Sequence, residues 1–349
     1  MEKQDIRKFS VEELENIVIA FGEPKFKAKQ LNEWIWQKGV LDFEQMTNLS
    51  KKMRDNLNQN YAFNLFKQSH IQHSSDGTIK IGWKLHDFSV IESVIIPLPD
   101  ENRFTLCVSS QVGCSLNCSF CSTGKLKLKR NLLDYEIVEQ FIKCNAICME
   151  SFGHHLTNVV YMGMGEPLLN YDNVINSIDR LTNPNGFGYS TRRITLSTSG
   201  IINGIERMID DKVKVNLALS LHAANNITRT RLMGINKSNN IEELIDILTR
   251  YYDQSKAKMS FEYIMFHGVN DSNDDARNLV KLTKKFPVKV NIIEYNYVDE
   301  VPYTKATEDR INSFAKILVD HGVMTTVRRS RGKDIDAACG QLANKIKVS

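Results

Sequence analysis

The sequence predicts an α/β protein: a partial (βα)6 barrel that follows a small N-terminal helical domain and a β-extension. Strand-like and helix-like segments alternate from residue 103 onward, which is typical of parallel βαβ units. About six such units fit into roughly 230 residues, whereas a closed eight-unit barrel usually needs about 250 residues. We therefore expect an open barrel with its chemistry at the carboxyl ends of the strands.

The composition is that of an ordinary globular protein. Of the 349 residues, 42% are hydrophobic and 25% are charged, which excludes a disordered or fibrous chain. The formal net charge of +4 neither requires nor excludes a polyanionic partner. No apolar run approaches the roughly 18 residues that span a bilayer, and no apolar stretch follows the first basic residues. We expect a cytoplasmic protein that does not bind membranes.

Residues 1–70 are expected to form a helical accessory domain that contacts RNA. One helix-like segment starts at Ser10 with Glu13 at the capping-box spacing. A second, residues 25–39, carries four lysines around Trp34 and Trp36. Lysines and aromatic rings can bind phosphates and bases. This segment alone, however, favours a small helical subdomain with tryptophans in its core and a solvated basic face.

Residues 71–102 are expected to form a β-extension or linker, because residues 78–87 and 89–97 alternate like the strands of a hairpin. Residues 103–349 should form the catalytic core. Its predicted strands are 103–109, 158–163, 192–197, 215–220, 259–266, 288–296 and 323–329. Its predicted helices are 134–151, 171–182, 200–211, 241–253, 272–285 and 306–320.

Three of the seven cysteines lie in one short run. Cys114, Cys118 and Cys121 form a C-x3-C-x2-C pattern directly after the first predicted barrel strand. Three such thiolates can face one metal centre, either an iron–sulfur cluster with one open iron or a zinc site with a distant fourth ligand. Three free thiols in a loop are the remaining interpretation, but so dense a run seldom arises by chance.

The other cysteines fall into two pairs. Cys144 and Cys148 lie four residues apart on a predicted helix in an apolar context, so they are interpreted as buried core thiols. Cys107 and Cys339 are far apart in sequence. They can meet only if the first barrel strand and the C-terminal segment both reach the rim of the barrel.

Polar residues follow the ends of successive predicted strands. Gly163, Gly165 and Glu166 form a glycine-lined turn with one carboxylate, which can accept hydrogen bonds from an ammonium group. Any one polar residue at a strand end is more often a satisfied hydrogen-bonding group than a ligand. Several on one rim are what a bound nucleoside requires. Four more end later strands: Ser197, Ser220, His222 and Asn296.

The cysteine run, with Phe120 before its third cysteine at the end of a barrel strand, resembles the radical S-adenosylmethionine (SAM) superfamily. Further motifs resemble the RlmN/Cfr family of RNA methyltransferases within it. The resemblance spans about residues 90–342 with the motifs in the expected order, and the N-terminal segment agrees only in general character. These motifs are residues 107–114, 162–170, 196–200, 220–222 and 331–342.

The resemblance implies one [4Fe–4S] cluster per chain, held by Cys114, Cys118 and Cys121, and two SAM molecules consumed per turnover. Glu166 matches the site for the amino group of SAM. The resemblance also implies an electron donor such as flavodoxin or ferredoxin, and we expect a monomer. The implied contacts to SAM are Gly165, Glu166, Ser197, Ser220, Leu221, His222 and Asn296.

The resemblance further implies a thiol relay, because C2 of adenine is not nucleophilic. Cys339 takes a methyl group from one SAM. Its S-methyl group loses a hydrogen atom to the 5′-deoxyadenosyl radical from a second SAM and then bonds to C2. Glu92 matches the base that removes the C2 proton, although a glutamate on a strand edge is usually a solvated charge. Cys107 then attacks the Cys339 sulfur, which releases methylated RNA and leaves a disulfide.

The implied substrates are adenosine 2503 of 23S ribosomal RNA and adenosine 37 of some transfer RNAs, each flipped out of its stack. Two basic runs without an acid bracket the expected site and favour contact with phosphates, although a basic run is usually a solvated face. One run is Lys125, Lys127, Lys129 and Arg130, and the other is Arg328, Arg329, Arg331 and Lys333.

Two alternatives remain open from the sequence. The nearer one is a Cfr-type methyltransferase, which modifies C8 of the same ribosomal adenosine, confers antibiotic resistance and shares the cluster and both relay cysteines. The other is a non-catalytic, zinc-dependent RNA-binding module. The first differs from the favoured function in the modified atom, and the second differs in the bound metal.

Overall fold

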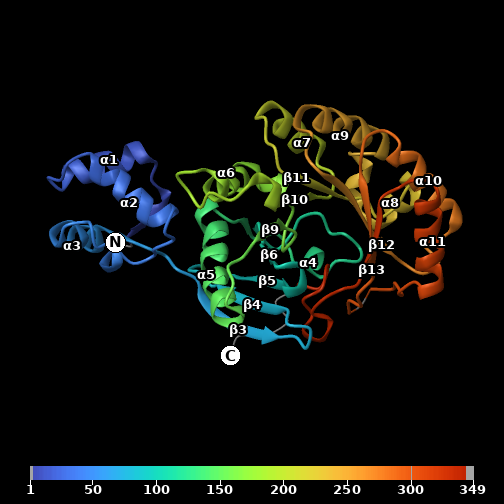
Figure 1. Ribbon diagram of the computed structural model, residues 1–349, viewed down its shortest axis with the longest axis horizontal. Coiled ribbons are helices and arrows are strands. Elements are labelled where there is room, and N and C mark those ends of the chain that lie inside the picture. Colours follow the sequence, from blue (N-terminus) through green and yellow to red (C-terminus); the bar gives the residue numbers. More distant parts are fainter. Residues whose placement is uncertain (1–2, 300, 343–349) are drawn as a thin grey trace.

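The chain is organised around one ten-stranded sheet, seen in a computed structural model that describes residues 3–299 and 301–342. Its strand order is β14-β13-β12-β11-β10-β9-β6-β5-β4-β3. The strands from β6 to β14 in this order run parallel, and β5, β4 and β3 continue the sheet antiparallel. Helices cover the outer face of the parallel part (Figure 1).

The parallel part has six βα units and a final strand, as predicted, and it is an open sheet. Its strands are β6 (Arg103–Cys107), β9 (Asn158–Tyr161), β10 (Ile194–Thr198), β11 (Asn216–Ser220), β12 (Met259–Met265), β13 (Lys289–Glu294) and β14 (Thr325–Arg328). The covering helices are α5 (Asp134–Phe152), α6 (Tyr171–Thr182), α7 (Ile202–Asp210), α9 (Ile241–Ser255), α10 (Asn273–Thr283) and α11 (Glu308–Asp320).

Short elements near the carboxyl ends of the strands were not predicted. They are α4 (Ser122–Lys125), the two-stranded ribbon β7 (Gln111–Val112) and β8 (Arg130–Asn131), and α8 (Asn226–Leu232). These elements have too few residues to show a helical or strand period.

Residues alternate between the two faces of each parallel strand. In β12, Phe261 and Tyr263 are fully buried beneath the helices, whereas Ser260, Glu262 and Ile264 line a cavity inside the curved sheet. Because the side-chain period of a strand is two, each strand gives one row to the core and one row to the cavity. The hydrophobic core therefore lies between the sheet and its outer helices.

The predicted β-extension belongs to the main sheet. It consists of β3 (Lys67–His73), β4 (Ile79–Lys84) and β5 (Val90–Leu98), and β5 pairs antiparallel with β6. The expected boundary at residue 70 falls inside β3, and the division into three domains stays a prediction. Within the described ranges, no helix is long and apolar enough to cross a bilayer.

Three helices form the N-terminal module: α1 (Val11–Ala20), α2 (Phe26–Trp36) and α3 (Lys51–Asn60), on one side of the molecule in Figure 1. The predicted capping box is present, because Ser10 Oγ accepts from the Glu13 amide and Glu13 accepts from the Ser10 amide. Trp36 is buried in the core of this module. That core also contains Tyr135 and Val138, which belong to α5.

A buried ion network joins the module to the barrel. The Arg7 guanidinium donates to Asp5 Oδ2 and to Glu139 Oε2, both at 2.7 Å. All three side chains are almost fully buried. Glu139 lies on α5, and its other oxygen accepts from the Phe66 amide at 2.6 Å. Removing one partner of such a network leaves an uncompensated buried charge.

We therefore expect Arg7→Met to lower the free energy of unfolding by about 3–5 kcal/mol. Lys25→Met is the matched control, because Lys25 pairs with Glu15 at 2.9 Å but is largely exposed. The control should change stability by no more than about 0.5 kcal/mol. Urea unfolding of both variants measures this, and equal losses would show that the buried network does not hold the module in place.

Candidate active site

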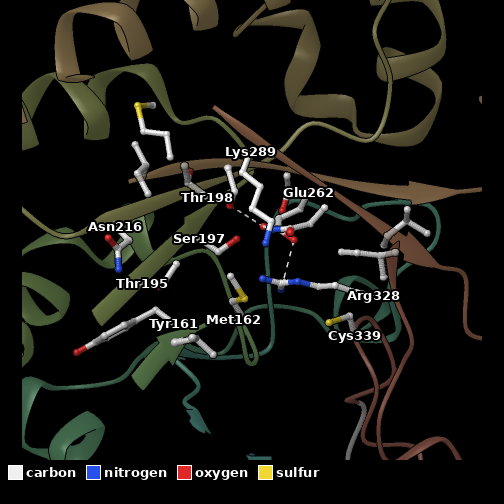
Figure 2. A pocket seen from close by; sticks show the side chains of 18 of the residues that line it. Tyr161, Met162, Thr195, Ser197, Thr198, Asn216, Glu262, Lys289, Arg328 and Cys339 are labelled. Carbon is white, nitrogen blue, oxygen red and sulfur yellow. Dashed lines mark hydrogen bonds and ion pairs between the residues drawn. The ribbon is translucent and has the colours of Figure 1, made fainter. Parts of the chain in front are cut away.

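The inner faces of the strands enclose a cavity of about 1580 Å³. Figure 2 shows Met162, Ser197, Glu262, Arg328 and Cys339 pointing into it from several strands and from the C-terminal segment. The cavity also reaches the loop after β6 and the turn after β9. Most of the predicted site residues lie on its wall: Cys107, Cys114, Cys118, Cys121, Gly165, Glu166, Ser197, Ser220, His222 and Cys339.

The three-cysteine run lies in the loop between β7 and α4, and all three cysteines line the cavity. The loop is tied at both sides, because the Cys114 amide donates to Leu126 O and the Ser119 amide donates to Leu232 O. Burial raises the pKa of Cys114 to about 11 and also raises that of Cys118. Negative charge on the neighbouring cysteines adds to both shifts, so the thiols lie close together.

Buried hydrogen bonds hold the start of this loop. Gln140 on α5 accepts from the Ser109 amide and donates to Ser109 O, each at 2.9 Å. Ser109 Oγ donates to Glu92 O at 2.6 Å and accepts from the Met164 amide. Gln140 and Ser109 were not among the predicted site residues, because an isolated glutamine on an amphipathic helix gives no motif.

The glycine-lined turn packs against the same loop. Gly165 has φ +99°, and a Cβ there would lie 2.5 Å from Gln111 Cβ, so no side chain fits. Gln111 accepts from the Glu166 amide at 2.8 Å. One Glu166 oxygen accepts from the amide and hydroxyl of Ser199, and burial raises the pKa of this carboxyl group.

His222 lines the cavity after β11, and a buried arginine influences its charge. His222 Nδ1 accepts from the Ile264 amide at 3.1 Å, and its ring packs edge-on against Phe120 at 5.0 Å. Burial and the charge of Arg229 lower the pKa of His222 to about 3, so the ring is neutral at pH 7. Arg229 on α8 is fully buried and donates to Ser199 O. Arg229 was not among the predicted site residues, because it lies on α8, a helix that was not predicted.

Three predicted site residues do not line the cavity. Leu221 is buried, and its amide donates to Glu262 O. Asn296 is buried and donates to Ser330 Oγ at 2.9 Å. Glu92 lies on β5, which is not an edge strand because β4 pairs with it. Glu92 is therefore only 1% exposed and is not the solvated charge that was expected.

The two distant cysteines line the same cavity. Cys107 ends β6, and Cys339 reaches the cavity from the C-terminal segment, where Figure 2 shows it beside Arg328. Burial raises the pKa of Cys107 to about 12, and the Cys339 sulfur adds to this shift. Both are free thiols. Cys144 and Cys148 are fully buried in the core, as predicted.

The two basic runs differ from expectation, because several of their charges have internal partners. Arg328 lies 3.6 Å from Glu262, and Arg329 and Lys333 both pair with the buried Glu294. In the first run, Arg130 pairs with Asp87 and Glu136. Lys127 and Lys129 are exposed, and neither forms an ion pair within the part of the chain that the structure describes.

Two family models match this chain. The ribosomal RNA large subunit methyltransferase N-terminal domain matches residues 4–62, and the radical SAM superfamily matches residues 108–280. Among solved structures, a radical SAM methyltransferase from Sphaerobacter thermophilus superposes with a TM-score of 0.91 and 38% identity. That alignment covers 97% of this chain and 99% of the other.

Curated relatives match along nearly the whole chain. A probable dual-specificity RNA methyltransferase RlmN of Cytophaga hutchinsonii is 48% identical over 345 residues, 99% of this chain and 94% of that protein. The one of Flavobacterium johnsoniae is 47% identical over 99% of this chain and 98% of its own length. A dual-specificity RNA methyltransferase RlmN of Geotalea uraniireducens is 42% identical over the same shares.

The radical SAM superfamily implies a [4Fe–4S] cluster and SAM, and the donor set fits a cluster. Burial raises the pKa of all three thiols, and a cationic cluster would favour the thiolate forms that bind it. Among the described residues, no His, Cys, Asp and Glu side chains converge closely enough to hold a single metal ion.

We expect Cys114→Ala, Cys118→Ala and Cys121→Ala each to lose the iron cluster, because each removes one of only three thiolates in the loop. Iron counting and absorbance near 400 nm after anaerobic reconstitution measure the loss. Cys144→Ala and Cys148→Ala are controls that should keep their iron and lose about 0.5–3 kcal/mol of stability. Full iron in any loop variant would mean that its cysteine is not a ligand.

Proposed function

Because this chain belongs to the RlmN family of dual-specificity RNA methyltransferases, which are radical SAM enzymes, we propose that it methylates C2 of adenosine 2503 in 23S ribosomal RNA and C2 of adenosine 37 in transfer RNA. The proposed route passes through an S-methylcysteine and a transient protein–RNA crosslink. One observation carries the proposal. The three-cysteine loop, the Glu166 turn and both distant cysteines line one cavity.

When bound, the cluster and SAM supply the methyl group and the radical that abstracts hydrogen. The residues of the chain do the rest. Cys339 is the nucleophile that accepts the methyl group and later carries the carbon to adenine C2. Glu166, held by Ser199, offers a carboxylate oxygen to the amino group of SAM. His222, kept neutral by burial, shapes the wall for the adenosine part of SAM.

Cys107 is proposed as the second thiol of the relay. After the crosslink forms, the Cys107 sulfur loses its proton and attacks the Cys339 sulfur, and the bond from Cys339 to the bridging CH2 carbon breaks. The released carbon takes up a proton and becomes the methyl group. The influence of Cys339 on the pKa of Cys107 supports close approach of the two sulfurs. The product is methylated RNA and a disulfide that external reductant must reopen.

Glu92 is proposed as the group that accepts the C2 proton. It lies on the cavity side of β5, because its strand neighbours Ile96 and Leu98 share that face and line the cavity. Its carboxylate lies 3.8 Å from Lys80 Nζ and 3.7 Å from His70 Nε2. Glu92 is buried, so adenine can reach it only if residues that cover it move locally.

Further parts of the proposal concern partners and location. We propose a monomer that acts in the cytoplasm and takes electrons from a flavodoxin or a ferredoxin. The proposed RNA-contacting side chains are Lys127 and Lys129, since four other cations of the basic runs pair with carboxylates, and Lys125 and Arg331 donate to backbone carbonyl groups. Mass spectrometry of digested RNA against C2- and C8-methyladenosine standards tests the position. C8-methyladenosine would replace the proposal with the Cfr-type activity.

We expect Cys107→Ala to trap the crosslink, because no second thiol is left to release the Cys339 sulfur. The variant should still methylate Cys339 and cleave SAM. Its product should be protein joined to RNA, visible as a nuclease-sensitive shift on a denaturing gel.

Cys339→Ala and the Cys107→Ala, Cys339→Ala double variant are the controls for this experiment. Neither should shift, because neither can carry the methyl group. Free methylated RNA from Cys107→Ala, at the wild-type rate and without a shift, would show that Cys107 only packs.

Lys127→Gln with Lys129→Gln should weaken RNA binding and lower the slope of log affinity against log salt. Each lost phosphate contact should reduce that slope by roughly 0.7–0.9. Lys212→Gln with Lys214→Gln is the matched control, because these lysines are also exposed and spaced by two, at the opposite end of the strands. Equal slopes for the two double variants would show that Lys127 and Lys129 only face solvent and do not contact RNA phosphates.

A further inference from the structure

The segment after β14 joins the two ends of the open sheet. β14 is the last strand at one end of the strand order, and the β4-β3 hairpin lies at the other end. Residues 331–336, which follow β14, form hydrogen bonds with the turn 74–78 between β3 and β4. We call this contact the hairpin clasp. The chain therefore crosses the gap of the barrel just before it reaches Cys339.

The clasp uses one aspartate from each side. The Gly332 amide donates to Asp76 Oδ2 at 2.9 Å. In return, Ser74 Oγ and the Ser75 amide donate to the two oxygens of Asp334, at 2.6 and 3.0 Å. A carboxylate accepting from an amide and a hydroxyl forms stronger hydrogen bonds than neutral partners do.

The backbone at the clasp allows close approach. Gly332 has φ +63°, and a Cβ there would lie 2.7 Å from Ala337 Cβ and 3.0 Å from a Thr78 methyl group. Only glycine fits between the turn and the segment. The Ala337 amide then donates to Gly332 O at 2.9 Å, which turns the chain toward the cavity.

A second anchor follows Cys339 at once. The Ser122 amide at the start of α4 donates to Gly340 O at 2.8 Å, and Thr123 Oγ1 donates to Leu342 O at 2.7 Å. Cys339 thus lies on a short span between the clasp and the loop that carries the three cysteines. Fixing both ends of a short span limits where the sulfur can lie.

Lys80 extends the clasp toward Glu92. Its ammonium group donates to Asp336 O at 3.3 Å and lies 3.8 Å from Glu92 Oε1, and the side chain is buried. The same lysine therefore contacts the segment that carries Cys339 and the proposed proton acceptor. In the proposed reaction the adenine carbon bears both the bond from Cys339 and the proton that Glu92 removes, so the two groups need a fixed relation.

We propose that the β3–β4 turn is the positioning element for the Cys339 thiol, with Asp334 and Ser74 as positioning residues remote from the cavity. The functional part rests on the proposed role of Cys339 as methyl carrier. The positional part concerns only where the thiol lies, so it can be tested without any reaction on RNA.

The first test is alkylation of Cys339 by iodoacetamide in the anaerobic holoenzyme, followed by mass spectrometry on the fraction with unmodified Cys339. Cys339 is exposed, but burial against the cavity wall raises the pKa of its thiol. Asp334→Ala and Ser74→Ala should each accelerate alkylation, roughly threefold to tenfold, because loss of the clasp lets the thiol move away from that wall. Asp334→Asn, which keeps an acceptor oxygen, should fall between wild type and Asp334→Ala. The double variant should match the single variants, because both remove the same contact.

The matched control is Asp100→Ala, in the turn between β5 and β6, where the aspartate is exposed and forms no side-chain hydrogen bond or ion pair among the described residues. Its alkylation rate should equal that of wild type, and Cys144 should stay unreactive in every variant. Equal Cys339 rates in Asp334→Ala, Ser74→Ala and Asp100→Ala would overturn the proposal.

A second measurement separates this inference from the proposed function. In a single turnover, Asp334→Ala should transfer the Cys339 methyl carbon to RNA roughly tenfold more slowly, with unchanged iron content and unchanged SAM cleavage in the absence of RNA. If Cys339 were not the carrier, the alkylation contrast would persist while RNA was methylated at the wild-type rate. Wild-type alkylation together with normal transfer would leave the relay intact and exclude the clasp.

Discussion

The alternation of side chains along the parallel strands is the constraint on which the rest of this structure depends. Closed barrels fill their interior with branched apolar residues, so no space is left inside. Here the inner row is largely short or polar, and the apolar residues occupy the outer row beneath the helices. The core lies outside the curved sheet, and the inside remains hollow. The inner row includes Thr105, Cys107, Ser197, Ser220, Ser260, Glu262, Asn291 and Thr326.

Buried polar contacts turn the loops around this hollow into one connected rim. Gln140 holds the loop after β6, and Ser109 links that loop to the turn after β9. Glu166 in that turn accepts from Ser199 after β10, and Arg229 donates to the carbonyl group of the same serine. Because each loop satisfies a buried group of the next one, a shift in one loop leaves a neighbour unpaired. The rim therefore resists independent movement of its parts.

The strands, the long helices and the cysteine loop could be predicted because their signals are local: periodicity, caps and short spacing. Pairing between distant segments could not. Nothing near Arg328 and Lys333 in the sequence indicates their partners, Glu262 on β12 and Glu294 on β13. The burial of Glu92 was not predicted, because whether a strand lies at the edge of a sheet depends on which other strand pairs with it. The strand β4 provides that pairing.

The N-terminal module borrows part of its core from α5. Tyr135 and Val138 pack into it, and Glu139 binds Arg7 beside them. A ribosome makes the module first and reaches α5 only later, at about 5–20 residues per second. For several seconds the apolar surface that α5 later covers is therefore exposed on the nascent module. Its maturation on the ribosome is governed by translation of a helix that belongs to the barrel, so slow codons before that helix would prolong exposure to chaperones and proteases.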